Sequence, residues 1–216
     1  MNITNYSAPR VKRLIDLVVA GTALALLSPV MLIVSVVIAL NMGLPVLFRQ
    51  ERPGLHGRPF QMLKFRTMSN ATDAQGQLLP DDVRLGRLGR FLRASSLDEL
   101  PELWSIVRGE MSLVGPRPLL MRYMNRYTPE QLRRYQVKPG LTGWAQIKGR
   151  NSLGWDEKFL LDCWYVDHHS TWLDLKILVL TIPSVLARRG ISAAGHSTMP
   201  EFMGTQKCEQ QDREHG

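Results

Sequence analysis

The sequence predicts an α+β fold, mainly helical with a small β-hairpin, in a single compact domain that carries an N-terminal membrane helix-hairpin. Residues 17–40 contain no charged side chain, which indicates a membrane segment. Two short strand-like runs flank residues 54–57, and much of the remaining chain shows helical spacing of its apolar residues. We therefore divide the chain into a membrane anchor at 1–44, a compact domain at 45–203 and a disordered tail at 204–216.

The apolar run of the anchor is long enough to cross a bilayer core, since about 24 helical residues extend about 36 Å. Ser28-Pro29 lies in its middle and should break or kink the helix. Cationic residues flank both ends, Arg10, Lys12 and Arg13 before the run and Arg49 and Arg52 after it. A hairpin that enters and leaves on one membrane face satisfies both observations, and a kinked transmembrane helix is the open alternative.

The segments after the anchor predict a β-hairpin, a loop and a cationic helix. Residues 45–50 and 58–68 are the strands, and the period of two places Lys64 and Arg66 on one face. Residues 69–82 lack any period and form a loop that could close over a substrate. A row of arginines at three-residue spacing follows, at Arg84, Arg87, Arg90 and Arg93.

An amphipathic helix with an acidic start is predicted next. Apolar residues recur at helical spacing, at Leu97, Leu100, Leu103, Trp104 and Val107. Pro101 is tolerated only in the first turn, which makes Asp98 the N-cap, although Ser96 and Glu99 also fit a capping box. A role limited to capping would stabilise the helix by about 1 kcal/mol.

A chemical role for the acids is the sharper interpretation. A carboxylate at a helix N-terminus stays ionised, and the same end attracts phosphate. Arg117 stands between Pro116 and Pro118, which hold the backbone extended and aim the guanidinium group. An acidic nucleophile beside an aimed arginine suggests phosphoryl transfer.

The remaining segments predict mainly helices. Residues 119–127 and 129–137 are helical pieces, the second with Thr128 as N-cap, and 155–168 is a further helix. Residues 138–150 form a glycine-rich loop whose Trp144 would sit at a membrane interface or stack on a base. Residues 173–186 are too short and too charged to span a membrane, and form a core or interfacial helix ending near residues 188–190.

Composition narrows the classes of partner. The net charge of +8 indicates a polyanion, either nucleic acid, anionic lipid or a phosphorylated substrate. The sequence lacks zinc-finger spacing and RNA-recognition signatures, so nucleic acid is not expected. Two cysteines are too few for a disulfide framework and fit a reducing compartment, and the five histidines lack metal-ligand spacing.

Several motifs together resemble one family. KFRTM, Arg93, SSLDELPELW, RGEMSLVGPRP and KPGLTGWAQIKGR are similar, in this order, to the bacterial sugar transferases, the monotopic phosphoglycosyl transferases. The likeness covers roughly residues 12–203 and favours the chemical role of the acidic pair over the capping role. It also implies the re-entrant form of the anchor.

The resemblance implies transfer of a sugar-1-phosphate from a UDP-sugar to undecaprenyl phosphate or another polyprenyl phosphate, with release of UMP. Asp98 would be the nucleophile that carries a phosphosugar-aspartyl intermediate, and Glu99 would position it. Both acids would hold Mg²⁺. The residues expected to bind phosphate or substrate are Lys64, Arg93, Arg117 and, as a weaker candidate, Asp174.

The enzyme is expected on an anionic lipid bilayer, the bacterial inner membrane, with its catalytic domain facing the cytoplasm. The short chain and the ending GHSTMPEF resemble the diacetylbacillosamine-phosphate transferases. A homodimer is kept open. The alternative from another class is a non-catalytic basic membrane adaptor that binds anionic lipid. A multi-pass lipid phosphotransferase is disfavoured, because the sequence has a single long apolar segment.

Overall fold

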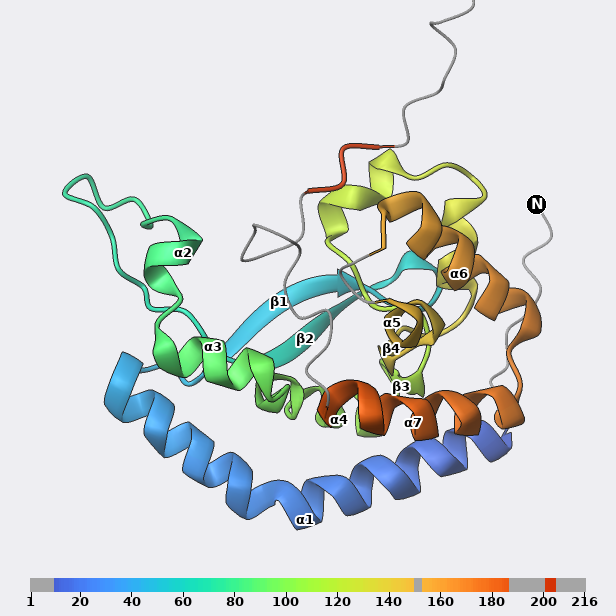
Figure 1. Cartoon of the computed structure of the whole chain (residues 1–216), viewed down its shortest axis with the longest axis horizontal. Coiled ribbons are helices and arrows are strands. Elements are labelled where there is room, and N and C mark those ends of the chain that lie inside the picture. The colour runs from blue at the N-terminus through green and yellow to red at the C-terminus, as the bar shows by residue number, and fades with distance from the viewer. Residues whose placement is uncertain (1–9, 150–152, 187–200, 205–216) are drawn as a thin grey trace, which may run out of the picture.

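The computed structural model describes residues 10–149, 153–186 and 201–204. Figure 1 shows this part of the chain as a body of helices and two small sheets lying along one side of the long helix α1. The elements are α1 (Arg10–Met42), β1 (Leu47–Pro53), β2 (Pro59–Phe65), α2 (Asp81–Arg84), α3 (Arg87–Ala94), α4 (Glu102–Arg108), β3 (Ser112–Val114), β4 (Gly140–Thr142), α5 (Trp144–Lys148), α6 (Trp155–His168) and α7 (Thr171–Leu186).

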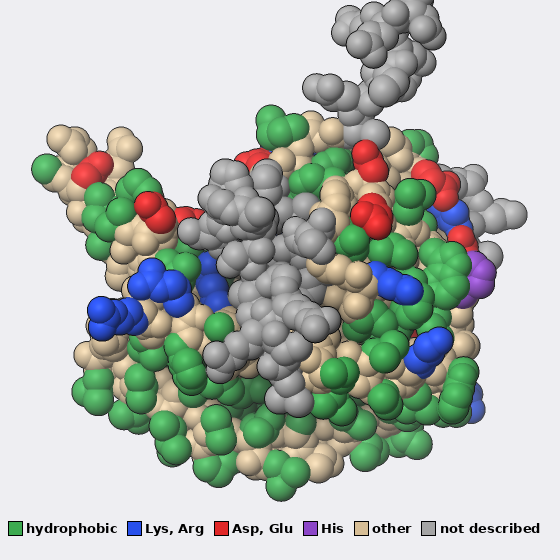
Figure 2. All heavy atoms as spheres, in the orientation of Figure 1, with side chains coloured by type: hydrophobic (Ala, Val, Ile, Leu, Met, Phe, Trp, Pro, Cys, Tyr) green, Lys and Arg blue, Asp and Glu red, His purple; other side chains and the backbone are tan. Residues whose placement is uncertain are grey.

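The anchor is one continuous helix with a bend. α1 runs through Pro29 without a break, so the predicted pair of separate helices is replaced by a single helix that curves near its middle (Figure 1). Within the described residues it is the one helix long and apolar enough to cross a membrane. Apolar side chains cover its outer side and give the molecule a hydrophobic face (Figure 2), among them Leu14, Val18, Leu26, Leu32, Ile33 and Leu40.

Side chains near the start of α1 attach it to the domain. The Lys12 Nζ atom donates to Asp174 at 2.5 Å, and Asp16 accepts from the Leu113 amide at 2.9 Å. Arg13 donates to the carbonyls of Ile106 (2.6 Å) and Val107 (2.8 Å), at the C-terminal end of α4. Lys12 and Arg13, two of the cations before the apolar run, therefore bind groups within the protein.

The C-terminal end of α1 is attached by one arginine. Arg66 is buried and donates to the carbonyls of Met42, Gly43 (2.6 Å) and Leu44 (3.2 Å). These carbonyls would otherwise lack partners, because the last turn of a helix has none of its own. Both ends of α1 are thus held against the same domain.

The predicted hairpin is confirmed. β1 and β2 pair antiparallel, with Leu47 opposite Phe65 and Pro53 opposite Pro59. Lys64 lies on the strand face that also carries the buried Phe60 and Met62, so this face is not the solvated one. Arg66, which the period of two places on the same face as Lys64, follows the last residue of the strand and turns to the end of α1.

One strand of a second sheet, β4, lies within the segment predicted as a glycine-rich loop, and its partner β3 precedes Pro116. β3 and β4 pair in parallel, with Ser112 opposite Gly140 and Val114 opposite Thr142. A Cβ atom on Gly140 would lie 2.0 Å from the Gly115 amide nitrogen, so only glycine permits this approach. The pairing fixes the segment that continues into Pro116–Pro118.

The predicted helical pieces after Pro118 are 3-10 helices, Met121–Arg126 and Gln131–Gln136. The cap position of the second is Glu130 and not the predicted Thr128, although the Thr128 Oγ1 accepts from the Gln131 amide at 3.2 Å. Buried aromatic rings pack here in one cluster, Tyr123, Tyr127, Tyr135, Phe159 and Phe202. These tyrosines therefore pack inside the domain and do not lie at a membrane interface.

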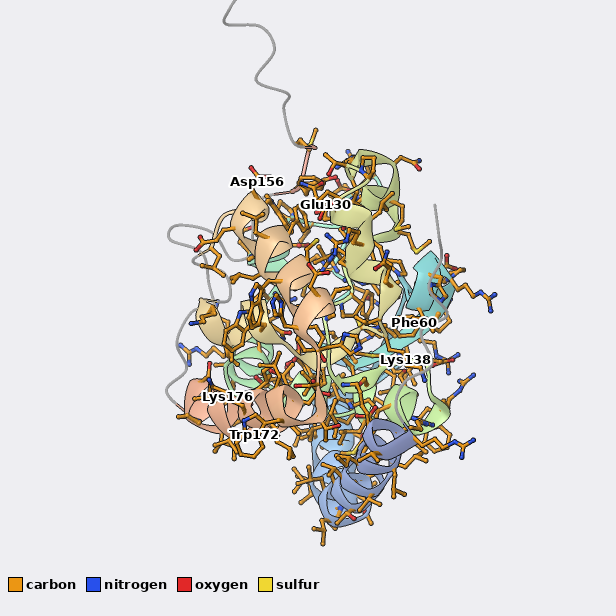
Figure 3. The ribbon with its side chains drawn as sticks, turned by 90° about the vertical axis from the view of Figure 1, so that its right-hand side faces the viewer. Phe60, Glu130, Lys138, Asp156, Trp172 and Lys176 are labelled. Atoms are coloured by element: carbon orange, nitrogen blue, oxygen red, sulfur yellow. The ribbon has the colours of Figure 1, made fainter. Side chains whose placement is uncertain are left out.

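The last helices follow the prediction. α6 and α7 are present, and α6 lies beside the 3-10 helix Gln131–Gln136, as the labelled Asp156 and Glu130 indicate (Figure 3). Trp144 stacks on Trp164 of α6, with ring centres 5.1 Å apart. The predicted helix end at residues 188–190 and the tail from 205 onward lie outside the described residues.

Candidate active site

The acidic pair lies in a short turn between two helices. After α3, Ser96 adopts a left-handed conformation with φ of 56°, and residues Leu97–Glu99 form one 3-10 turn. Pro101 then precedes α4, which begins at Glu102 and has no side-chain cap. The prediction that Asp98 caps this helix is wrong, and its carboxylate is free for another use.

The register of the α4 face differs from the prediction in one position. Leu103 is buried as expected, but Trp104 is 50% exposed, and Ile106 is fully buried in its place. The cause is the 3-10 turn, which advances the chain by fewer residues per turn than an α-helix and shifts the face that follows. α4 packs on α1 through this face.

Glu99 is held by two cations. Its Oε1 accepts from Lys64 Nζ at 2.7 Å and also pairs with Arg117 Nη2. Burial alone would raise the pKa of Glu99, but Arg117 and Lys64 overcome this effect and hold the pKa well below its ordinary value. Glu99 is therefore ionised throughout the physiological range and joins β2 to the Pro116–Pro118 segment.

Asp98 lies in the opposite electrostatic situation. It is 8% exposed, and within the part of the chain that the structure describes it makes no ion pair. Burial raises the pKa of Asp98 to about 6, and the neighbouring Glu99 adds to the shift, while Lys64, Arg117 and Arg93 oppose it. At neutral pH the group is a carboxylate that is more basic than an ordinary aspartate.

Arg93 reaches the site from the last turn of α3. Its Nε donates to Thr67 Oγ1 at 3.1 Å, and its charge acts on Asp98. α3 approaches Thr67 closely, because a Cβ atom on Gly89 would fall 1.8 Å from the Thr67 carbonyl oxygen. The glycine that interrupts the arginine row thus permits the packing that brings Arg93 beside Asp98.

Glu102 is a third acid that the sequence reasoning missed. It is 2% exposed, and its Oε1 lies 3.0 Å from Lys64 Nζ. Burial raises the pKa of Glu102 against the opposing effect of Lys64, while Glu99 and Glu102 together raise the pKa of Lys64 despite its burial. The spacing of the sequence could have indicated Glu102, since residues three apart, such as 99 and 102, lie on one face of a helical segment.

Arg134 is a second missed residue. It is 2% exposed and donates from Nη2 to the Arg117 carbonyl oxygen at 2.8 Å. Asp162 of α6 accepts from its Nη2 at 2.7 Å and its Nε at 3.1 Å. A buried ion pair, in which Arg134 makes two hydrogen bonds to Asp162, therefore holds the backbone of Arg117 in place. The contact could not be predicted from the sequence, because Arg134 lies 17 residues from Arg117 and 28 residues from Asp162.

Asp174 lies in a separate network. It accepts from Lys12 at 2.5 Å and from the Tyr165 hydroxyl at 2.6 Å, and both bonds are buried. The structure thus brings together Lys64, Arg93, Asp98, Glu99 and Arg117, and it places Asp174 where the start of α1 meets α7.

The expected Mg²⁺ would have to be held by Asp98 and Glu99. The described residues hold no group of three or more metal-ligating side chains. Mg²⁺ usually keeps several waters and binds through one or two carboxylates together with substrate phosphates. Asp98 and Glu99 are adjacent carboxylates and fit that mode of binding, in which the phosphates complete the coordination.

Comparison with known proteins identifies the class. The model of the bacterial sugar transferase family matches residues 7–188, so the chain belongs to this family. It is 53% identical over 194 residues to the uncharacterized sugar transferase EpsL of Bacillus subtilis, a match that covers 90% of this chain and 96% of that protein.

Two further relatives carry names that state a reaction. The chain is 44% identical over 186 residues to the UDP-glucose:undecaprenyl-phosphate glucose-1-phosphate transferase of Caulobacter vibrioides, covering 81% of this chain and 69% of the relative. It is 34% identical over 206 residues to the undecaprenyl-phosphate galactose phosphotransferase of Salmonella typhimurium, covering 88% of this chain and 43% of the relative. The chain is accordingly an enzyme of the sugar-phosphate transferase class.

Proposed function

We propose that the enzyme transfers a sugar-1-phosphate from a UDP-sugar to a polyprenyl phosphate such as undecaprenyl phosphate, releases UMP, and so initiates a membrane-bound glycan. One observation carries this proposal: the buried carboxylate of Asp98 is free of ion pairs among the described residues and lies beside an acid held by Lys64 and Arg117. The names of the relatives support both substrates.

In the first step a carboxylate oxygen of Asp98 attacks the sugar-proximal phosphorus of the donor. The bond from this phosphorus to the UMP oxygen breaks, and UMP leaves with the electron pair. The product on the enzyme is an acyl phosphate that joins Asp98 to the phosphosugar. A pKa of about 6 suits this role, because the group stays ionised at neutral pH while its basicity favours attack.

In the second step an oxygen of the lipid phosphate attacks the same phosphorus, and the Asp98 carboxylate departs. Glu99 orients Arg117 and Lys64 through its ion pairs, and Arg117 neutralises charge on the transferred phosphoryl group. Mg²⁺ held by Asp98 and Glu99 would offset the charge of the diphosphate.

The direct test supplies purified enzyme with polyprenyl phosphate, Mg²⁺ and one UDP-sugar at a time. The panel contains UDP-glucose, UDP-galactose, UDP-N-acetylglucosamine and UDP-diacetylbacillosamine, and the measurement is UMP release. We expect release with at least one donor, dependent on the lipid. Membrane binding without UMP release from any donor would contradict the proposal and favour the basic adaptor.

We further propose that α1 is re-entrant and keeps both of its ends on the cytoplasmic face of the inner membrane. Supporting this, both ends of α1 are bonded to one domain, and the helix, which contains Pro29, bends between them (Figure 1). A helix that crossed the bilayer would have to release the bonds at one end.

Topology is tested by labelling single-cysteine variants at residues 5 and 50 in a background without Cys163 and Cys208. A membrane-impermeant thiol reagent applied to intact spheroplasts should label neither Asn5→Cys nor Gln50→Cys, and both should react after lysis. Labelling of Asn5→Cys before lysis would establish a crossing helix.

A further inference from the structure

Three cations converge on the Pro116–Pro118 segment from different elements. Arg117 belongs to the segment itself and pairs with Glu99 on one side. Arg52 of β1 arrives beside it and donates from Nη1 to the Pro118 carbonyl oxygen at 3.4 Å. Its Nε is buried and has no hydrogen-bond partner within the described residues.

Lys158 is presented to the same segment by α6. It lies one helical turn before Asp162, whose ion pair with Arg134 leads directly to the Arg117 carbonyl. Its Nζ is 5.2 Å from the centre of the Trp155 ring, a cation–π contact that directs the lysine along the helix surface. Arg52 and Lys158 both lie close enough to Arg117 for its charge to act on them.

The three charges repel one another. Burial and then Arg117 lower the pKa of Lys158 to about 8, and the same two causes lower the pKa of Arg52 to about 10. Each side chain remains partly open to solvent. Gathering like charges in this way costs stability in the free protein, and a bound anion would reverse the cost.

We propose that Arg52, Arg117 and Lys158 form the subsite for the nucleotide-proximal phosphate of the donor, the group that departs as UMP. This inference rests on the proposed function and extends it to the leaving group. Arg117 would stand between the two phosphorus atoms, with Asp98 and Glu99 on one side and Arg52 and Lys158 on the other. As the phosphorus–oxygen bond breaks, negative charge grows on the departing phosphate, where these cations stabilise it.

The test measures binding of UMP to the purified protein by calorimetry, so it needs no turnover. We expect Lys158→Gln to weaken UMP binding about tenfold, which is the effect of losing one charge-assisted hydrogen bond. Arg52→Gln should act in the same direction. Binding of glucose-1-phosphate, which lacks the nucleotide phosphate, should change by less than about twofold in both variants.

The matched control is Lys176→Gln, the same charge change at an exposed position of α7, well below Asp156 in the view of Figure 3. It should leave UMP binding unchanged. Thermal unfolding without UMP separates the subsite from a structural role, because removing a repelled charge should keep or raise the melting temperature of Lys158→Gln, whereas loss of a structural contact would lower it.

Unchanged UMP binding in Lys158→Gln and Arg52→Gln would overturn the subsite, as would equal weakening of UMP and glucose-1-phosphate. The outcome is separable from that of the proposed function. A wild-type protein that binds UMP through Lys158 yet transfers no phosphosugar would retain the subsite and refute the transferase reaction.

Discussion

Asp98→Asn should abolish turnover and the first half-reaction together. Enzyme given a UDP-sugar without lipid acceptor should release UMP up to about one equivalent, because the phosphosugar stays on Asp98. The asparagine variant keeps the shape of the side chain but lacks the oxyanion, so the burst should vanish. A residue that only caps a helix would tolerate this change, since Asn and Asp cap about equally well.

Mass spectrometry of the burst product identifies the nucleophile. An adduct of one phosphosugar should map to Asp98 in the wild-type protein and be absent from Asp98→Asn. Glu99→Gln is the control at the neighbouring acid and should slow turnover and weaken metal dependence while still forming an adduct. An adduct on Glu99 would mean that the roles of the pair are reversed, and UMP release that strictly requires the lipid would favour direct displacement.

Asp98→Asn should also be more stable toward unfolding than the wild type at pH 8. The folded pKa of Asp98 is raised from 3.8 to about 6, so the folded state binds the proton more tightly than the unfolded state. The ionised group therefore opposes folding above pH 6, and this penalty disappears as the pH falls toward 4. Asp98→Asn should raise the free energy of unfolding by about 1–3 kcal/mol at pH 8 and by little at pH 4.

Local pattern was sufficient to predict the hairpin and α6, because each depends on residues close in the chain. The 3-10 turn that carries Asp98 and Glu99 could not be predicted from local pattern. Helical spacing suggested an α-helix that starts at Asp98. The structure instead has a 3-10 turn before Pro101, which shifts the register, so that Ile106 is buried in the core and Trp104 is exposed. A one-residue change in turn geometry has no signature in apolar periodicity.

The supports of the site could not be predicted for a different reason. Arg134 touches Arg117 across 17 residues, and Lys64 reaches Glu99 across 35. Sequence reasoning found Lys64 and Arg117 through the family motifs, whereas Arg134 lies in a segment whose spacing indicated only a helix. Arg13 shows the same effect, because its place before the apolar run predicted a membrane flank, whereas its side chain binds the carbonyls at the end of α4.

Arg117→Lys should lower kcat by about two to three orders of magnitude with little effect on membrane association or on the fold. The guanidinium group of Arg117 donates to Glu99 and can contact phosphate at the same time, and its planar fork gives these bonds fixed directions. Lysine keeps the charge, but its single ammonium group cannot hold both partners in the same geometry. Steady-state UMP release and the burst amplitude, measured with the same donor, report the loss.

Two measurements distinguish this role from a general effect of charge. Arg122→Lys, at a cation that pairs with Glu201 near the surface, is the matched control and should retain activity. The pKa of Arg117 is raised, by Glu99 first, so the wild-type guanidinium group keeps its charge at every working pH, and raising the pH should not reproduce the defect. If Arg117→Lys turns over at the wild-type rate, directed hydrogen bonding by Arg117 is not needed, and charge neutralisation by Lys64 and its neighbours would have to account for phosphate handling.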